Sequence, residues 1–197
     1  MSALAISNIV LWVLVLVLAA VVLALARQVG VLHERIAPAG ALMLNRGLTV
    51  GEPGPALEVA DLAGRAHRVG SPRADGRSTL LLFVSPSCPV CKSLLAAVKS
   101  SAKDERAWMD VILASDGDRA EQSEFVRTQG LDGIPYVVSA ALGLAYQVGR
   151  LPFAALLDER GILRARGLVN SREHLESLFE AKRLGVASLQ EYFSSTA

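Results

Sequence analysis

The sequence predicts an α/β sandwich around a mixed central sheet, preceded by one transmembrane helix, and three features support this. The first 26 residues contain no charged side chain, although the chain has 20 basic and 19 acidic residues. Beyond them, apolar runs of strand length alternate with segments of helical periodicity. The chain then ends in a hairpin and a helix, an order typical of α/β folds with a mixed sheet.

Composition excludes several classes of protein. With a net charge of +1, the chain lacks the excess of basic residues that binds the phosphates of nucleic acid. Its aromatic content of 5% also leaves few side chains on which bases could stack. Two cysteines cannot build a disulfide scaffold, and with three scattered histidines they do not form a four-ligand zinc site. We therefore expect neither a nucleic-acid partner nor a bound metal.

The N-terminal segment predicts a membrane anchor over residues 1–26. Residues 9–26 form an uninterrupted apolar run, long enough to span the hydrocarbon core as a helix. A cleaved signal peptide is the alternative, because Ala24-Leu25-Ala26 has the small residues of a cleavage site, but no basic side chain precedes the run. We expect a juxtamembrane helix and linker over 27–50 and a folded domain over 51–197.

The charges beside the anchor bear on its orientation. Arg27 and Arg35 follow the span, whereas only the α-amino group precedes it. The positive-inside rule, taken alone, weakly favours a cytoplasmic C-terminal domain.

The first half of the domain predicts a hairpin followed by two buried strands. Short alternating pieces at 57–59 and 66–69 predict the hairpin. Residues 79–85 and 109–115 are apolar runs expected of strands covered on both faces. A helix over 89–103 separates them, and its apolar positions are Val90, Leu94, Leu95 and Val98.

The second half predicts three strands and three helices. Capping-box patterns at Asp118/Glu121 and Asn170/Glu173 open the first and last of these helices. The first runs to about residue 129, and the last carries Leu175, Leu178 and Phe179 on one face. A short strand over 136–139, a short helix over 141–147, a strand over 153–157 and a hairpin return over 162–169 lie between them.

The two cysteines carry the chemistry. Cys88 and Cys91 directly follow a buried strand and begin a helix, separated by two residues. The positive end of the helix dipole stabilises a thiolate on the first cysteine, and Pro89 is tolerated in the first turn. We expect Cys88 to be the exposed nucleophile and Cys91, one turn deeper, to resolve the mixed disulfide. This chemistry needs no cofactor beyond the redox-active disulfide between them.

The strand LLLFVS followed by CPVCK, and GRLPF leading into ALLDERGIL, resemble the thioredoxin-like superfamily over about residues 50–184. The resemblance implies a three-layer α/β/α sandwich and a cis-proline facing the CxxC motif. Pro152 matches that proline, and its predecessor Leu151 would offer backbone groups to a client peptide. Pro135 fits less well, because no comparable strand and Asp-x-x-Gly turn follow it.

Two departures distinguish this chain from thioredoxin itself. Ser87 precedes Cys88 where thioredoxin has tryptophan, and Leu82 stands where thioredoxin keeps a buried aspartate. A fast reductase of the cytosolic type, with an internal carboxylate as proton acceptor, is therefore not expected.

The whole chain resembles one branch more closely, the MauD family of methylamine-utilisation accessory proteins. The uncharged span running into ALARQVGVLHERIAPAGAL, the VGEPGP entry, CPVCK and GLVNSREHLESLFEA carry this resemblance. It implies a disulfide oxidoreductase or isomerase that helps to mature the disulfide-rich small subunit of methylamine dehydrogenase. It also implies a domain in the periplasm, held at the inner membrane. We prefer this orientation over the arginine count, because such chemistry needs an oxidising compartment.

Three other functions remain open from the sequence. A membrane-anchored thiol reductase of c-type cytochrome maturation shares the fold, the anchor and the CxxC motif. A peroxidase is favoured by Ser85, three residues before Cys88, where peroxiredoxins have threonine or serine. Peroxiredoxins also carry a proline six residues before the cysteine, and Leu82 stands at that position here. A copper carrier would want a histidine near the dithiol, and none is evident.

Overall fold

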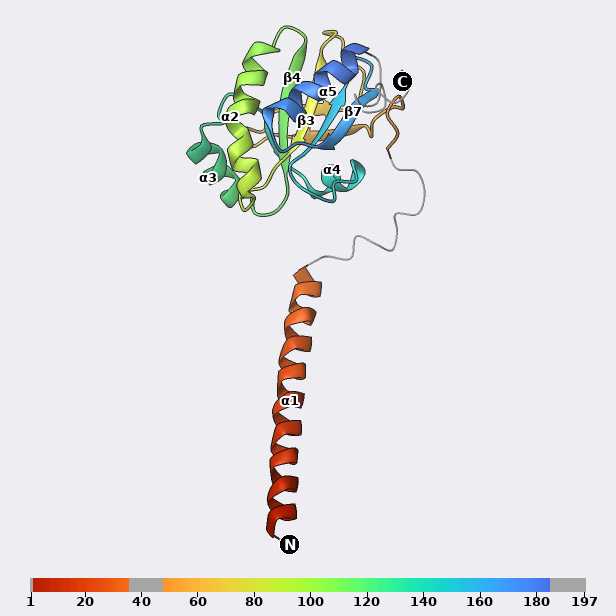
Figure 1. The fold of residues 1–197 in the computed structure, drawn as a ribbon. Coiled ribbons are helices and arrows are strands. Elements are labelled where there is room, and N and C mark those ends of the chain that lie inside the picture. The colour runs from red at the N-terminus through yellow and green to blue at the C-terminus, as the bar shows by residue number, and fades with distance from the viewer. Residues whose placement is uncertain (1, 36–47, 185–197) are drawn as a thin grey trace, which may run out of the picture. The chain divides into compact units, whose positions relative to one another are not determined.

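The computed structural model describes residues 2–35 and 48–184, and the chain divides into two units, one ending at residue 45 and the other beginning at residue 46 (Figure 1). The first unit contains the helix α1 (Ser2–Arg35). Its segment Leu4–Leu23 has a mean hydropathy of 2.9 and no buried residue. Twenty helical residues rise about 30 Å, so this segment is long and apolar enough to cross a membrane.

The region after the span was predicted to be a juxtamembrane helix followed by a linker, and its first residues are helical. α1 continues without interruption to Arg35. The rest of the predicted linker, from residue 36 to residue 47, lies outside the described residues.

The second unit is built on a five-stranded mixed sheet in the order β5-β4-β3-β6-β7. The central strand β3 (Ser78–Phe83) pairs in parallel with β4 (Met109–Ser115), which pairs in parallel with the edge strand β5 (Tyr136–Val138). On its other side β3 pairs antiparallel with β6 (Phe153–Leu157), and β6 pairs antiparallel with β7 (Leu163–Leu168). The predicted mixed sheet and its closing hairpin are thus confirmed.

The sheet has a separate apolar cluster on each face, because successive side chains of a strand point to opposite sides. Leu80 and Leu82 of β3 pack in the cluster that contains residues of three helices, whereas Leu81 and Phe83 pack in the other. The first cluster is covered by α2 (Pro89–Asp104), α3 (Arg119–Gln129) and α5 (Arg172–Leu184). The second is covered by α4 (Ala140–Ala145) and the hairpin of β1 (Leu57–Ala60) and β2 (Ala66–Val69).

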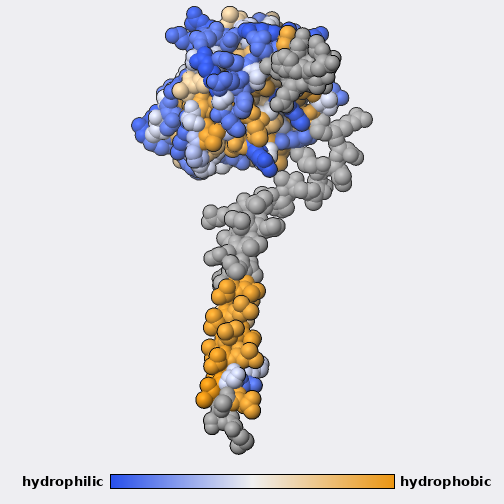
Figure 2. Space-filling model, viewed as in Figure 1, coloured by the Kyte–Doolittle hydropathy of each residue, from blue (hydrophilic) through white to orange (hydrophobic). Residues whose placement is uncertain are grey.

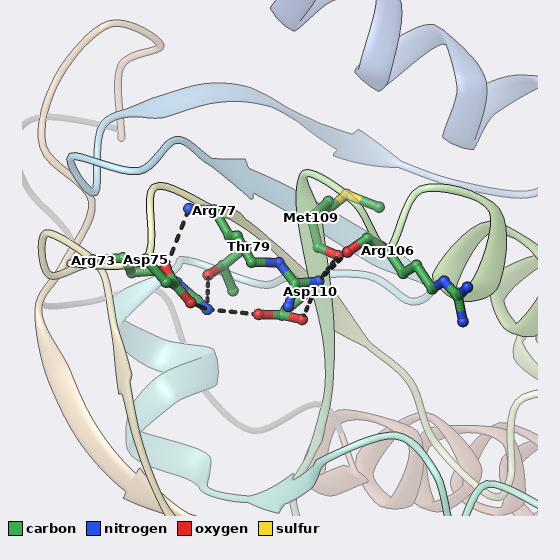
Figure 3. A network of polar contacts seen from close by, with 7 residues as sticks. All are labelled: Arg73, Asp75, Arg77, Thr79, Arg106, Met109 and Asp110. Atoms are coloured by element: carbon green, nitrogen blue, oxygen red, sulfur yellow. Dashed lines mark hydrogen bonds and ion pairs between the residues drawn. The ribbon is translucent and has the colours of Figure 1, made fainter.

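A polar network ties together the beginnings of β3 and β4 (Figure 3). The Asp110 carboxylate accepts from Arg73 Nη2 at 2.6 Å and pairs with Arg77 Nη2 at 2.7 Å. Arg73 also contacts Asp75, and Arg77 donates to the Met109 carbonyl at 2.9 Å. Because parallel strands begin at the same edge of a sheet, this network lies at the opposite edge from the segment that follows β3.

Two predicted details are wrong. Val90 does not share the buried face of α2 but is 42% exposed, because the face that packs on the sheet begins at Cys91. The last helix begins at Arg172, one residue later than expected, so Ser171 takes the place predicted for Asn170. Its Oγ accepts the His174 N–H at 3.4 Å.

Candidate active site

The loop between β3 and α2 holds the dithiol at the carboxyl edge of the parallel strands. The Val84 N–H donates to the Ala114 carbonyl, which extends the pairing of β3 with β4 by one residue. A tight turn follows, in which the Cys88 N–H donates to the Ser85 carbonyl at 3.1 Å. The Ser85 hydroxyl lies 2.9 Å from that of Ser87 and accepts the Ser87 N–H. Both of these contacts of the Ser85 hydroxyl are with Ser87, inside the turn.

Cys88 is the N-cap residue of α2. Its backbone is extended, with φ −92° and ψ 110°, and its Sγ accepts the Cys91 N–H at 3.1 Å. Pro89 follows in the first turn, where the absence of an N–H costs no helical hydrogen bond. The sulfur therefore lies at the positive end of the helix dipole and satisfies one of the free N–H groups of the first turn. The side chain is partly exposed and therefore open to a partner.

Cys91 lies one turn deeper and is fully buried, among Leu94, Leu95 and the strand residue Leu82. Both cysteines are free thiols in this structure. Burial, and after it the hydrogen bond with the Cys88 sulfur, raise the pKa of the Cys91 thiol. Cys91 is thus a protonated, shielded sulfur behind a more accessible one.

A buried tyrosine belongs to the same apolar cluster as Cys91, and the sequence did not reveal it. The Tyr136 hydroxyl donates to Gln122 Oε1 at 2.6 Å, and Gln122 Nε2 donates to the Asp116 carbonyl at 2.8 Å. Burial raises the pKa of Tyr136 to about 12, so the phenol remains protonated. Leu82 of β3 is buried in this cluster, and the bonded phenol and amide come from β5 and α3.

The segment before β6 lies at the same edge of the sheet as the dithiol loop. Phe153 pairs with Phe83, so Pro152 lies beside the continuation of β3 toward Cys88. The Leu151–Pro152 peptide bond is cis, as the resemblance implied, and Pro135 is not in a cis bond. The Pro152 carbonyl accepts the Val169 N–H at 3.1 Å, whereas no backbone hydrogen bond of Leu151 occurs within residues 48–184. Leu151 is 37% exposed.

The histidines of the folded unit take part in other contacts. His67 Nε2 lies 3.0 Å from the Asp61 carboxylate, and His174 Nδ1 accepts the Asn170 N–H. Within the residues that the structure describes, no three His, Cys, Asp or Glu side chains are grouped to hold a metal ion.

Comparison with known proteins identifies the family, although no family model matches the chain. It is 48% identical over 189 residues to the methylamine utilization protein MauD of Paracoccus denitrificans, covering 96% of this chain and 94% of the relative. The chain belongs to the MauD family. The MauD protein of Methylorubrum extorquens is 45% identical over 189 residues, with 96% and 91% covered.

Solved structures establish the fold of this MauD family member. The exposed lipoprotein thioredoxin Etrx1 of Streptococcus pneumoniae strain TIGR4 gives a TM-score of 0.55 at 20% identity, covering 64% of this chain and 99% of that one. A secreted Mycobacterium tuberculosis disulfide oxidoreductase homologous to E. coli DsbE gives 0.51 at 20% identity, covering 64% and 95%. The thioredoxin-like fold that the sequence resemblance implied is confirmed.

Proposed function

We propose that this protein is a membrane-anchored thiol–disulfide oxidoreductase or isomerase that matures the small subunit of methylamine dehydrogenase. The observation that carries the proposal is the pair of sulfurs at the start of α2, where Cys88 is the partly exposed N-cap and Cys91 is buried behind it. Membership of a family named for methylamine utilization supports the choice of client. The reaction needs only the two sulfurs of the chain.

In the first step, the Cys88 thiolate attacks one sulfur of a client disulfide. The new bond joins Cys88 to the client, and the other client sulfur leaves as a thiolate and takes up a proton. Cys91 does not compete for the client, because its sulfur is buried and its raised pKa keeps it protonated.

In the second step, Cys91 loses its proton and attacks Cys88 of the mixed disulfide. The Cys88–Cys91 disulfide forms, the second client sulfur leaves as a thiol, and two electrons have passed from the protein to the client. The same steps in reverse oxidise a client dithiol. If a second client thiolate expels Cys88 instead, the client disulfide is isomerised and the protein is regenerated.

The segment before β6 supports a role in holding the client. Leu151 is partly exposed and its backbone groups are unused within residues 48–184, so an extended client segment can pair with them as an added strand. The buried Pro152 lies next to it and has no N–H to compete for a thiolate.

We further propose that α1 anchors the protein in the inner membrane with the folded unit in the periplasm. The length and hydropathy of Leu4–Leu23 support the anchor. A disulfide-rich client supports the orientation, because disulfides form and persist in an oxidising compartment.

Trapping of mixed disulfides tests the proposal. The Cys91→Ser protein, incubated with the purified small subunit in its disulfide form, should accumulate a covalent complex that dithiothreitol releases. The matched Cys88→Ser protein should form none, because the remaining sulfur is buried. Equal trapping by the two variants would refute the assigned roles, and trapping by neither would refute the proposed reaction with this client.

The reduction potential of the Cys88–Cys91 pair tests the direction of transfer. A value near about −270 mV would favour a reductase, whereas about −120 mV would favour a strong oxidant. Equilibration with glutathione buffers, followed by mass spectrometry of the alkylated protein, measures it.

A further inference from the structure

A cavity of about 490 Å³ lies beside the segment that precedes Pro152. Its apolar lining includes the buried side chains of Phe83 and Ala114, at the ends of β3 and β4. Leu144 of α4 and Leu151 also line it, and these side chains are 63% and 37% exposed. The lining is therefore largely apolar, with Ser115, Asp116 and Ser139 as polar members, and two of its apolar side chains are open to solvent.

The apolar residues exposed on the folded unit gather at this edge of the sheet. Besides Leu184, the large apolar side chains exposed within residues 48–184 are Val90, Leu144, Leu151 and Leu168. Val90 lies between the two cysteines, and Leu168 pairs with Phe153, the residue after Pro152. Figure 2 shows apolar surface on the lower part of the domain, where α2 begins and α4 lies. Clustered exposed apolar residues indicate a binding surface.

One residue that lines the cavity carries a positive charge with no ion-pair partner among residues 48–184. Arg150 is exposed, lines the cavity and directly precedes Leu151. Its side chain forms no hydrogen bond or ion pair with any residue that the structure describes, whereas Arg73, Arg77 and Arg164 each pair with an aspartate. Asp116 also lines the cavity but forms no ion pair with Arg150. The guanidinium is therefore available for a carboxylate of a binding partner.

We propose that this cavity is a specificity pocket for the client, which takes a large aliphatic side chain while Arg150 binds an acidic residue of the same segment. The inference rests on the proposed function and specifies the class of client sequence. Side chains two apart in an extended segment point to the same side, so a segment paired with Leu151 presents them together. The recognised pattern is an aliphatic residue with an acidic residue two positions away.

A single-step exchange assay measures this preference whichever way electrons flow in the cell. The full-length Cys91→Ser protein in detergent micelles is mixed with an excess of a peptide disulfide. The Cys88 thiolate attacks it, one peptide thiol leaves, and the protein–peptide mixed disulfide is counted by mass spectrometry after acid quenching. Each rate constant is divided by that of the same protein with 2-hydroxyethyl disulfide, a small neutral substrate.

Each peptide carries leucine two positions from its cysteine and glutamate two positions beyond the leucine. One set of peptides has these residues before the cysteine, and a second set has them after it. In at least one direction, replacing leucine by glycine should slow the exchange about tenfold or more, because the apolar side chain is lost from the cavity. Replacing glutamate by lysine should slow it severalfold at low salt. That difference should shrink in 1 M salt, where the interaction between exposed charges is screened.

Variants of the pocket separate its two parts. A Cβ at Gly143 of α4 meets no atom within 4 Å, so Gly143→Leu adds an apolar side chain to the lining from an open position and should abolish the leucine preference. Gly133→Leu is the matched control, since Gly133 is equally open but lies before β5 and does not line the cavity, and it should keep the preference. Arg150→Gln should remove the glutamate preference, and Arg150→Glu should reverse it to favour lysine.

The outcomes distinguish this inference from the proposed function. Equal normalised rates for all peptides, or a leucine preference that survives Gly143→Leu, would overturn the specificity pocket while leaving the dithiol chemistry standing. A glutamate preference unchanged in Arg150→Glu would overturn the role of the arginine. A protein whose Cys88 reacts with neither the peptides nor 2-hydroxyethyl disulfide would overturn the proposed function, and the pocket with it.

Discussion

At the scale of single residues, the difference between the two cysteines predicts which one reacts with small reagents. Iodoacetamide at pH 8 should label the reduced protein once, at Cys88, because burial and a raised pKa withhold the Cys91 thiolate. The labelling rate of Cys91 should be lower by at least about a hundredfold and should rise to that of Cys88 in denaturant. Peptide mapping by mass spectrometry measures both. Two labels entering the native protein at equal rates would contradict the burial of Cys91.

Asp61 predicts an acid-sensitive contribution to stability. Its carboxylate is 1% exposed, and burial alone would raise its pKa, but hydrogen bonds from His67 and Arg65 outweigh burial and hold the pKa at about 2. A folded-state pKa below the ordinary value contributes stability that is complete above about pH 4 and is lost as the pH falls through about 2. Asp61→Asn should therefore lower the free energy of unfolding by about 2 kcal/mol at pH 6.

The check on Asp61 is the pH dependence of that difference. In denaturant unfolding of the detergent-solubilised protein, the gap between the parent and Asp61→Asn should narrow steadily from pH 5 to pH 2. If the difference in the free energy of unfolding stayed constant with pH, the substitution would act through packing, and the charge of the Asp61 carboxylate would contribute nothing to stability.

The sequence predicted the position of the two cysteines more readily than their surroundings. The spacing of Cys88 and Cys91 after an apolar run was enough to place them at a helix start, because that position depends on local sequence. Tyr136 could not be predicted, because its contact with Gln122 joins two different elements. The sequence indicated Arg150 and Leu144 only weakly. Leu144 lies off the buried side of α4, which is formed by Leu142 and by the C-cap residue Tyr146.

At the scale of secondary-structure elements, the start of α3 predicts a measurable capping energy. Asp118 is its N-cap, and its carboxylate accepts the N–H groups of Ala120 and Glu121 at 2.9 and 3.0 Å. Asp118→Ala should destabilise the protein by about 1 kcal/mol, a fall of roughly 2–4 °C in melting temperature. Asp132→Ala is the matched control, because this exposed aspartate has no recorded partner within residues 48–184. Equal falls in melting temperature for the two variants would show that the loss of a negative charge, and not the loss of the helix cap, destabilises the protein.

Most elements could be predicted because each satisfies a local rule. The strand at Phe153–Leu157 and the strand at Met109–Ser115 match their predicted bounds, since both are apolar runs between turn residues. Errors arose at helix ends. Asn170 and Ser171 are adjacent polar residues that can each cap, and the register of α5 favours Ser171.

At the scale of the whole molecule, the charges beside the anchor and the chemistry of the client predict opposite orientations of the folded unit across the membrane. Arg27 and Arg35 follow the span, and basic residues favour the cytoplasmic side by about 1 kcal/mol or less each near a membrane surface. Two such residues are a small bias. An exchange reaction on a disulfide-rich client, by contrast, has no substrate in a reducing compartment. This chemical requirement is the reason for the proposed periplasmic orientation, which a reporter fusion can test.

Alkaline phosphatase fused after Leu184 should be active, because it folds only where disulfides form, and the same fusion to a cytoplasmic reporter should be inactive. The purified protein should also retain residues 1–26 by intact mass, since we expect α1 to be an uncleaved anchor. Inserting two lysines after Met1 provides the control, because added positive charge at that end strengthens an orientation with the N-terminus inside. If the folded unit already faces the periplasm, the insertion leaves phosphatase activity per molecule unchanged. A rise in activity after the insertion would mean that the arginines hold the native domain in the cytoplasm.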